Sequence, residues 1–212
     1  VDRLRQGRFV DDIVIATTLD PTDDPVAAWA ETEGVLVYRG SEDDVLSRVV
    51  EAQRQLNSEI VVEICGDMPL LDPEIVDLAV ASFLANNCDV VTTVRVPSFP
   101  QGVDAEVFRL SDLEEVARTV DDPAVREHVS LYFYEHPERY RILNLLAPSS
   151  LSRPDARLQL DYPEDFDFVM KVYEQLEPTL GGAFGLTDII SLLDRDPTLM
   201  NINRHREERA AR

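Results

Sequence analysis

The chain has 212 residues, of which 41 are Asp or Glu and 20 are Lys or Arg, so its formal net charge is −21 at pH 7. A surface this acidic repels nucleic acids and anionic membranes, and we expect neither as a partner. No apolar run approaches the roughly 18 residues of a membrane-spanning helix, and no stretch resembles a secretory signal. We therefore expect one cytoplasmic domain with a substantial core and no membrane insertion.

Lys171 is the single lysine, and all other basic residues are arginine. In molar salt the Debye length is about 3 Å, so self-repulsion is screened and such a composition is typical of a halophilic source. A GC-rich genome also favours Arg over Lys, but it does not explain the excess of acid. The two cysteines, Cys65 and Cys88, lie in apolar, strand-like contexts without metal-ligand spacing. They are predicted to be small buried residues.

In the first half of the chain, apolar runs alternate with amphipathic stretches. Residues 59–64 are mostly apolar and β-branched, which is typical of a strand covered on both faces. Ser41 is a predicted helix N-cap, and Pro73 is placed to open another helix. The predicted elements are the end of a helix at 1–9, strand 11–18, helix 24–34, strand 35–38, helix 41–56, strand 59–64, helix 73–86 and strand 88–94. This alternation predicts an α/β fold with a Rossmann-like, doubly wound and mostly parallel sheet.

After residue 95 the pattern changes to a turn-rich loop followed by shorter elements. The predicted elements are strand 105–110, helices 111–120 and 123–136, strand 140–147, strand 156–161, helix 163–176 and helix 186–197. No repeat or linker divides the chain. We therefore predict one domain over residues 1–203, with a subregion at 95–145 and a charged tail at 204–212.

Asp67 and Asp161 occupy equivalent places in the pattern. Each follows an apolar strand and precedes a proline that begins a helix. Ligands of open α/β sheets bind outside the carboxyl ends of the strands. Two carboxylates meeting there suit Mg²⁺, which binds protein through one or two carboxylates and completes its octahedron with water and phosphate. The alternative is that each Asp is a turn residue that caps the next segment.

Five motifs in order make the sequence similar to a known family: residues 39–52, 65–77, 100–108, 125–142 and 158–176. Together they resemble the spore-coat polysaccharide biosynthesis branch of the cytidylyltransferases, relatives of the 3-deoxy-manno-octulosonate and acylneuraminate enzymes. The resemblance covers residues 3–203. It implies a fold of the nucleotide-diphospho-sugar transferase type and transfer of CMP from CTP to an acidic or unusual sugar, with release of pyrophosphate. It also implies a role in surface polysaccharide synthesis and a homodimer formed through residues 95–145.

The resemblance assigns metal-binding and nucleotide-binding residues. Asp67 and Asp161 would hold Mg²⁺ and would be the catalytic carboxylates. Ser41 and Arg48 would line the cytidine pocket, and Gly66 and Asp67 would also contact the nucleotide. The alternative to nucleotide contact for Arg48 is an ion pair on its own helix, with Glu51 or Asp44 as the partner.

The same resemblance places a sugar site beside residues 100–108 and 125–142. It nominates Asp104, Glu106, Arg126, Glu127 and His128 as substrate-binding residues. The alternatives are that the first two are solubilising acids on an edge strand and that His128 packs on an amphipathic helix.

The chain departs from the family pattern at its beginning. Family members start with a strand and a loop of the type A-R-x-x-S-x-R-x-P-x-K, which cradles the triphosphate. The chain shows no such segment, so we expect a fold that lacks its first strand and a chain that is partial. Two alternatives stay open: a non-catalytic paralogue that keeps the fold for binding or assembly, and a nucleotidyltransferase that uses another nucleotide.

Overall fold

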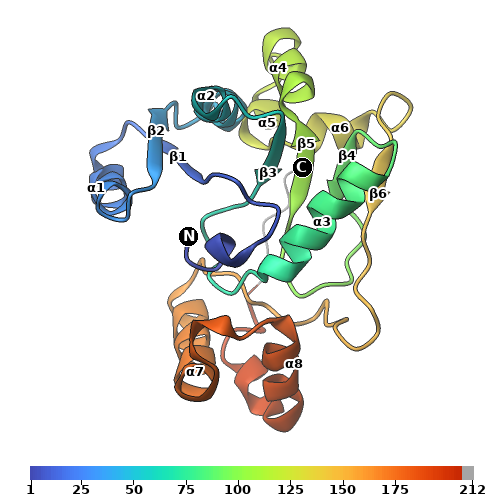
Figure 1. Ribbon diagram of the computed structural model, residues 1–212. Helices are drawn as coiled ribbons and strands as arrows, with labels where there is room; N and C mark the ends of the chain where they lie inside the picture. Colours follow the sequence, from blue (N-terminus) through green and yellow to red (C-terminus); the bar gives the residue numbers. More distant parts are fainter. Residues whose placement is uncertain (207–212) are drawn as a thin grey trace.

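The computed structural model describes residues 1–206; the part of the predicted charged tail at 207–212 lies outside the described residues. Its strands form two separate sheets (Figure 1). The strands are β1 Val14–Thr18, β2 Leu36–Gly40, β3 Ile60–Glu63, β4 Val90–Thr92, β5 Glu106–Arg109 and β6 Ile142–Asn144. The α-helices are α1 Asp24–Thr32, α2 Val45–Leu56, α3 Pro73–Ala85, α4 Leu110–Thr119, α5 Pro123–Glu127, α6 Leu131–Glu135, α7 Pro163–Leu180 and α8 Leu186–Arg195.

The prediction of one mostly parallel sheet is wrong. β1 and β2 pair in parallel as a small sheet of their own, next to α1. The other sheet has the order β3-β5-β4-β6 and is mixed, because β5 runs antiparallel to both of its neighbours. Only β4 and β6 pair in parallel within it. The fold is α/β, but its sheets are small and the larger one is mixed.

Both faces of the four-stranded sheet are buried, which explains the apolar runs that suggested parallel strands. Val91 and Val107 point into a core formed with α3, α7 and α8. Their neighbours Val90 and Phe108 point into a second core formed with α2, α4, α5 and α6. Alternate residues of a strand face opposite sides, so burial on both faces gives a continuous apolar run whatever the strand direction.

Local capping decides where the helices begin. α2 begins at Val45 rather than at the predicted Ser41, because the Asp44 side chain accepts a hydrogen bond from the Ser47 amide and so caps the helix. The predicted helix 123–136 is two short helices, α5 and α6, separated by a turn. The predicted helical end at residues 1–9 contains a short 3₁₀ turn, Leu4–Gln6.

Two further predictions need correction. Residues 156–161 do not form a strand; they run extended beside residue 101, with a single bridge between Gln101 and Arg157. Cys88 is buried as predicted, but Cys65 is exposed because β3 ends at Glu63 and Cys65 lies on the turn that follows. Within residues 1–206, no helix is both long enough and apolar enough to cross a lipid bilayer.

Candidate active site

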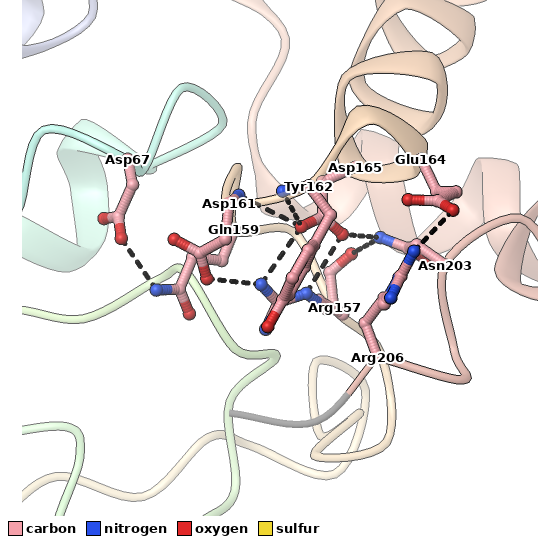
Figure 2. Close-up of polar contacts among 9 residues, drawn as sticks. All are labelled: Asp67, Arg157, Gln159, Asp161, Tyr162, Glu164, Asp165, Asn203 and Arg206. Atoms are coloured by element: carbon pink, nitrogen blue, oxygen red, sulfur yellow. Dashed lines mark hydrogen bonds and ion pairs between the residues drawn. The ribbon is translucent and has the colours of Figure 1, made fainter. Parts of the chain in front are cut away.

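The structure brings Asp67 and Asp161 to the same place, although 94 positions separate them. The turn after β3 carries Asp67, and its backbone carbonyl accepts a hydrogen bond from the Leu160 amide at 2.8 Å. Asp161 is the next residue, and α7 begins two positions later at Pro163. The two carboxylates therefore approach each other through a direct backbone contact between their segments (Figure 2).

One oxygen of Asp67 is held and the other is not. The Gln159 side-chain amide donates to Asp67 Oδ2 at 2.7 Å. Oδ1 is buried and has no hydrogen-bond partner among residues 1–206. Burial raises the pKa of Asp67, the Gln159 hydrogen bond opposes that shift, and the charge of Asp161 adds to it. A buried acceptor with an adjacent negative charge is a place where a cation would be stabilised.

Asp161 is held by a buried arginine. Arg157 donates through Nη2 to Asp161 Oδ2, and it also forms a two-pronged pair with Asp165, with both N–O distances at 3.0 Å. Asp165 in turn accepts from the Asp161 and Tyr162 amides at the start of α7. Asn203 donates to Asp165 and to the Arg157 carbonyl, which closes the network shown in Figure 2.

These residues fit a hard divalent cation with few protein ligands. Among the described residues, no group of three or more His, Cys, Asp or Glu side chains is arranged to hold a metal. A pair of carboxylates with one unsatisfied buried oxygen matches the way Mg²⁺ is bound, with water and phosphate as its other ligands. Asp67 and Asp161 are the residues that would hold it.

A second acidic pair lies at the same end of the sheet. Glu63 and Glu106 are opposite each other in the β3–β5 register, and Thr92 of β4 is opposite Glu106 on its other side. The Tyr134 hydroxyl contacts Glu106 and also Thr92, the latter at 2.7 Å. Burial, then the charge of Glu106, raises the pKa of Glu63 to about 8, and burial raises that of Glu106. Both shifts favour the protonated form of this pair.

Sequence reasoning found half of this second pair. It nominated Glu106, but the alternative that β5 is a solubilising edge strand is wrong, because β5 lies between β3 and β4. It missed Glu63 and Tyr134. Glu63 could have been found from the sequence, because it is a charged residue inside the apolar run 60–64. Tyr134 could not, because only the folded chain brings α6 next to Glu106. Asp104 contributes negative charge near Glu63.

The predicted cytidine contacts Ser41 and Arg48 lie close together, Ser41 on the turn between β2 and α2 and Arg48 in the first turn of α2. Arg48 donates to the backbone carbonyls of Ser41 and Glu42, so neither predicted ion pair, with Asp44 or Glu51, forms. The Ser41 hydroxyl accepts from the Asp44 amide. Gly66 is exposed beside Asp67, and a Cβ built there would touch nothing within 4 Å. Their nucleotide-binding role stays a prediction.

The predicted sugar contacts on α5 have varied surroundings. Arg126 donates to the Ala117 carbonyl at 2.6 Å, to the Ser47 hydroxyl at 3.0 Å and to Asp44 at 3.2 Å. It therefore links α5 to α2 and α4. Glu127 is exposed and His128 is half-buried. The role of these three residues toward a sugar stays a prediction.

Two open hollows of about 470 and 560 Å³ lie away from the paired aspartates. The first is lined by residues at the start of β3, the end of β5 and the end of α3, and the second by residues of α2 and α4. Neither contains Asp67 or Asp161. A site for a cation and a phosphate depends on charged groups rather than on an apolar cavity, so these hollows do not mark it.

The fold defines the class of protein: an α/β fold of the nucleotide-diphospho-sugar transferase type. The family model described as Cytidylyltransferase matches residues 1–183. The chain belongs to the cytidylyltransferase family, which confirms the resemblance drawn from the motifs.

Similar proteins align with this chain over nearly its whole length. An uncharacterized protein of Methanocaldococcus jannaschii is 32% identical over 212 residues, covering 100% of this chain and 85% of the relative. The spore coat polysaccharide biosynthesis protein SpsF of Bacillus subtilis is 31% identical over 205 residues, covering 93% and 82%. The solved structure of a cytidylyltransferase from Leptospira borgpetersenii superposes with a TM-score of 0.87 at 28% identity, covering 99% of this chain and 85% of that one.

Proposed function

We propose that this protein transfers CMP from CTP to a sugar and releases pyrophosphate. The observation that carries the proposal is the convergence of Asp67 and Asp161 in a chain that matches the cytidylyltransferase family over residues 1–183. The name of the Bacillus subtilis relative supports a sugar destined for a surface polysaccharide. The acceptor class is an acidic or otherwise unusual sugar, and the reaction takes place in the cytoplasm.

The residues divide into two groups in this proposal. Asp67 and Asp161 hold Mg²⁺ beside the triphosphate, and Ser41, Arg48 and Gly66 lie on the nucleotide side. When bound, the cation supplies charge neutralisation and Lewis acidity at the phosphate that is attacked. The residues nominated for the sugar side are Asp104, Glu106, Arg126, Glu127 and His128, and a homodimer would form through residues 95–145.

Nucleotide selectivity tests the proposal. Thermal melts are recorded with Mg²⁺ and CTP, UTP, ATP or GTP, each at the same concentration. A ligand that binds only the folded state raises the melting temperature, because at 100 times its Kd it adds about 2.7 kcal/mol to the free energy of unfolding. We expect CTP to give the largest increase. Equal increases with all four, or none with CTP, would contradict a cytidylyltransferase.

A further inference from the structure

We propose that Gln159 and Arg157 are positioning residues that hold Asp67 and Asp161 ready for a divalent cation. This inference rests on the cation site of the proposed function. Each carboxylate has one oxygen occupied by a fixed donor: Gln159 Nε2 on Asp67 Oδ2, and Arg157 Nη2 on Asp161 Oδ2. Both donors come from the same extended segment that carries Asp161 itself, so a single stretch of five residues orients both sides of the site (Figure 2).

Backbone hydrogen bonds to Gln101 hold the segment that carries Gln159 in place. Leu158 donates to the Gln101 carbonyl at 2.8 Å, and Gln101 donates to the Ala156 carbonyl at 2.9 Å. Gly102 has φ +86°, and a Cβ built on it would lie 2.6 Å from the Gln159 amide nitrogen. The two backbones therefore approach more closely than any side chain at position 102 would permit, which fixes the backbone position from which the Gln159 side chain reaches Asp67.

Arg157 is fixed more tightly still. Its side chain is 2% exposed, and its partner Asp165 is 0% exposed. A buried guanidinium paired through two prongs has one orientation. That orientation directs the remaining Nη2 hydrogen at Asp161. Asn203, from the end of the described chain, donates to the Asp165 carboxylate and to the Arg157 backbone carbonyl, which holds both residues in place. Arg157 Nη1 is buried and has no hydrogen-bond partner among residues 1–206.

The two donors counteract the electrostatic repulsion between the two carboxylates. Asp67 and Asp161 both carry negative charge, so they repel each other when no cation is present. Without a donor on its other oxygen, each carboxylate would be free to rotate away from the other. Donors outside the coordination sphere that orient metal ligands typically change metal affinity by about 10- to 100-fold.

The test measures Mn²⁺ binding by electron paramagnetic resonance, with Mn²⁺ alone as the probe. About 0.5 M KCl shortens the Debye length and so suppresses diffuse binding to this acidic chain. The Mn²⁺ bound at the candidate site is identified as the class of bound Mn²⁺ that is lost in Asp67→Asn. We expect Gln159→Leu to weaken that class by about 10-fold without a change in melting temperature, since Gln159 is only half-buried. Gln55→Leu, at an exposed position of α2, is the matched control and leaves binding unchanged.

A second variant tests Arg157. Lysine keeps the positive charge, but its ammonium group lacks the planar guanidinium geometry by which Arg157 donates to Asp161 and Asp165 at once. We expect Arg157→Lys to weaken Mn²⁺ binding, whereas Arg153→Lys, at a surface pair with Asp194, does not. If Arg157→Lys does not fold, the Gln159→Leu result decides.

The outcomes separate this inference from the proposed function. If CTP is selected and Asp67→Asn removes a Mn²⁺ site, but Gln159→Leu binds Mn²⁺ as the parent does, only the positioning role is overturned. If Asp67→Asn removes no Mn²⁺ site, the cation site fails and the positioning role fails with it.

Discussion

Four carboxylates at one end of the larger sheet differ in what surrounds them. Asp67 and Asp161 each have a fixed donor on one oxygen, and Asp67 keeps a buried oxygen without a partner among residues 1–206. Glu63 and Glu106 instead lie opposite each other, next to the Tyr134 hydroxyl. The first pair is arranged to attract a cation, and the second pair is arranged to retain a proton.

The second pair makes folding stability depend on pH. Glu63 has a pKa of about 8 in the folded state, against 4.5 for an unperturbed glutamate. Between these values the folded state binds more protons than the unfolded chain, so the free energy of unfolding falls as pH rises. The slope is at most about 1.4 kcal/mol per pH unit for one proton. Glu63→Gln should reduce this slope and raise stability near pH 8, with little effect near pH 4.

Urea unfolding at several pH values measures the effect. Glu31→Gln, at an exposed position of α1, is the matched control and should keep the parent's slope. Because Glu106 also has a raised pKa, some slope should persist in Glu63→Gln. A parent and a Glu63→Gln variant with the same pH dependence between pH 5 and 8 would contradict the buried-proton interpretation.

At the scale of elements, Arg126 is the clearest structural link between helices. Its guanidinium joins α5 to the carbonyl at the end of α4 and to the first turn of α2, and its side chain is 17% exposed. Arg126→Ala should lower the free energy of unfolding by about 2 kcal/mol, because hydrogen bonds from a charged donor are lost and their acceptors stay partly buried.

Chemical denaturation checks this expectation. Arg118→Ala, at an exposed position of α4, is the matched control and should change stability little. Full stability of Arg126→Ala, combined with weaker sugar binding, would contradict the structural role and favour the substrate contact that the family resemblance implies.

The elements also show which sequence signals determine structure. Helices α3 and α7 begin at the predicted prolines, because proline restricts the backbone whatever the tertiary context. The positions of β1 to β6 were predicted, whereas residues 156–161 form no strand. Strand direction was not predicted, because β5 gives the same apolar run in either direction. The proximity of Asp67 and Asp161 was predicted from their similar sequence contexts, because each follows an apolar run and precedes a proline that begins a helix. Arg157 and Gln159 carried no local signal, because their role depends on a loop contact across the chain.

At the scale of the whole molecule, net charge is the dominant feature. A charge of −21 on 212 residues makes the folded state repel itself. Salt screens that repulsion, with a Debye length of about 10 Å at 0.1 M and about 3 Å at 1 M. We expect the melting temperature to rise between these KCl concentrations. A fall would show that screening of favourable ion pairs outweighs relief of repulsion.

The same charge is the reason why we expect the candidate site to need a cation. The nucleotide is a polyanion, and the candidate site presents two further carboxylates to it. Binding without a divalent ion would place like charges together at short range, at a cost that no described contact offsets. We therefore expect CTP binding to depend on a divalent cation and on Asp67 in the same way.

Calorimetric titration of CTP tests this dependence most directly. It is run on the parent and on Asp67→Asn, each with Mg²⁺ and with EDTA. We predict that EDTA and Asp67→Asn each weaken CTP binding, and that EDTA has little further effect on the variant, since both remove the same interaction. An Asp67→Asn protein that binds CTP as tightly as the parent, and still loses affinity in EDTA, would contradict the account.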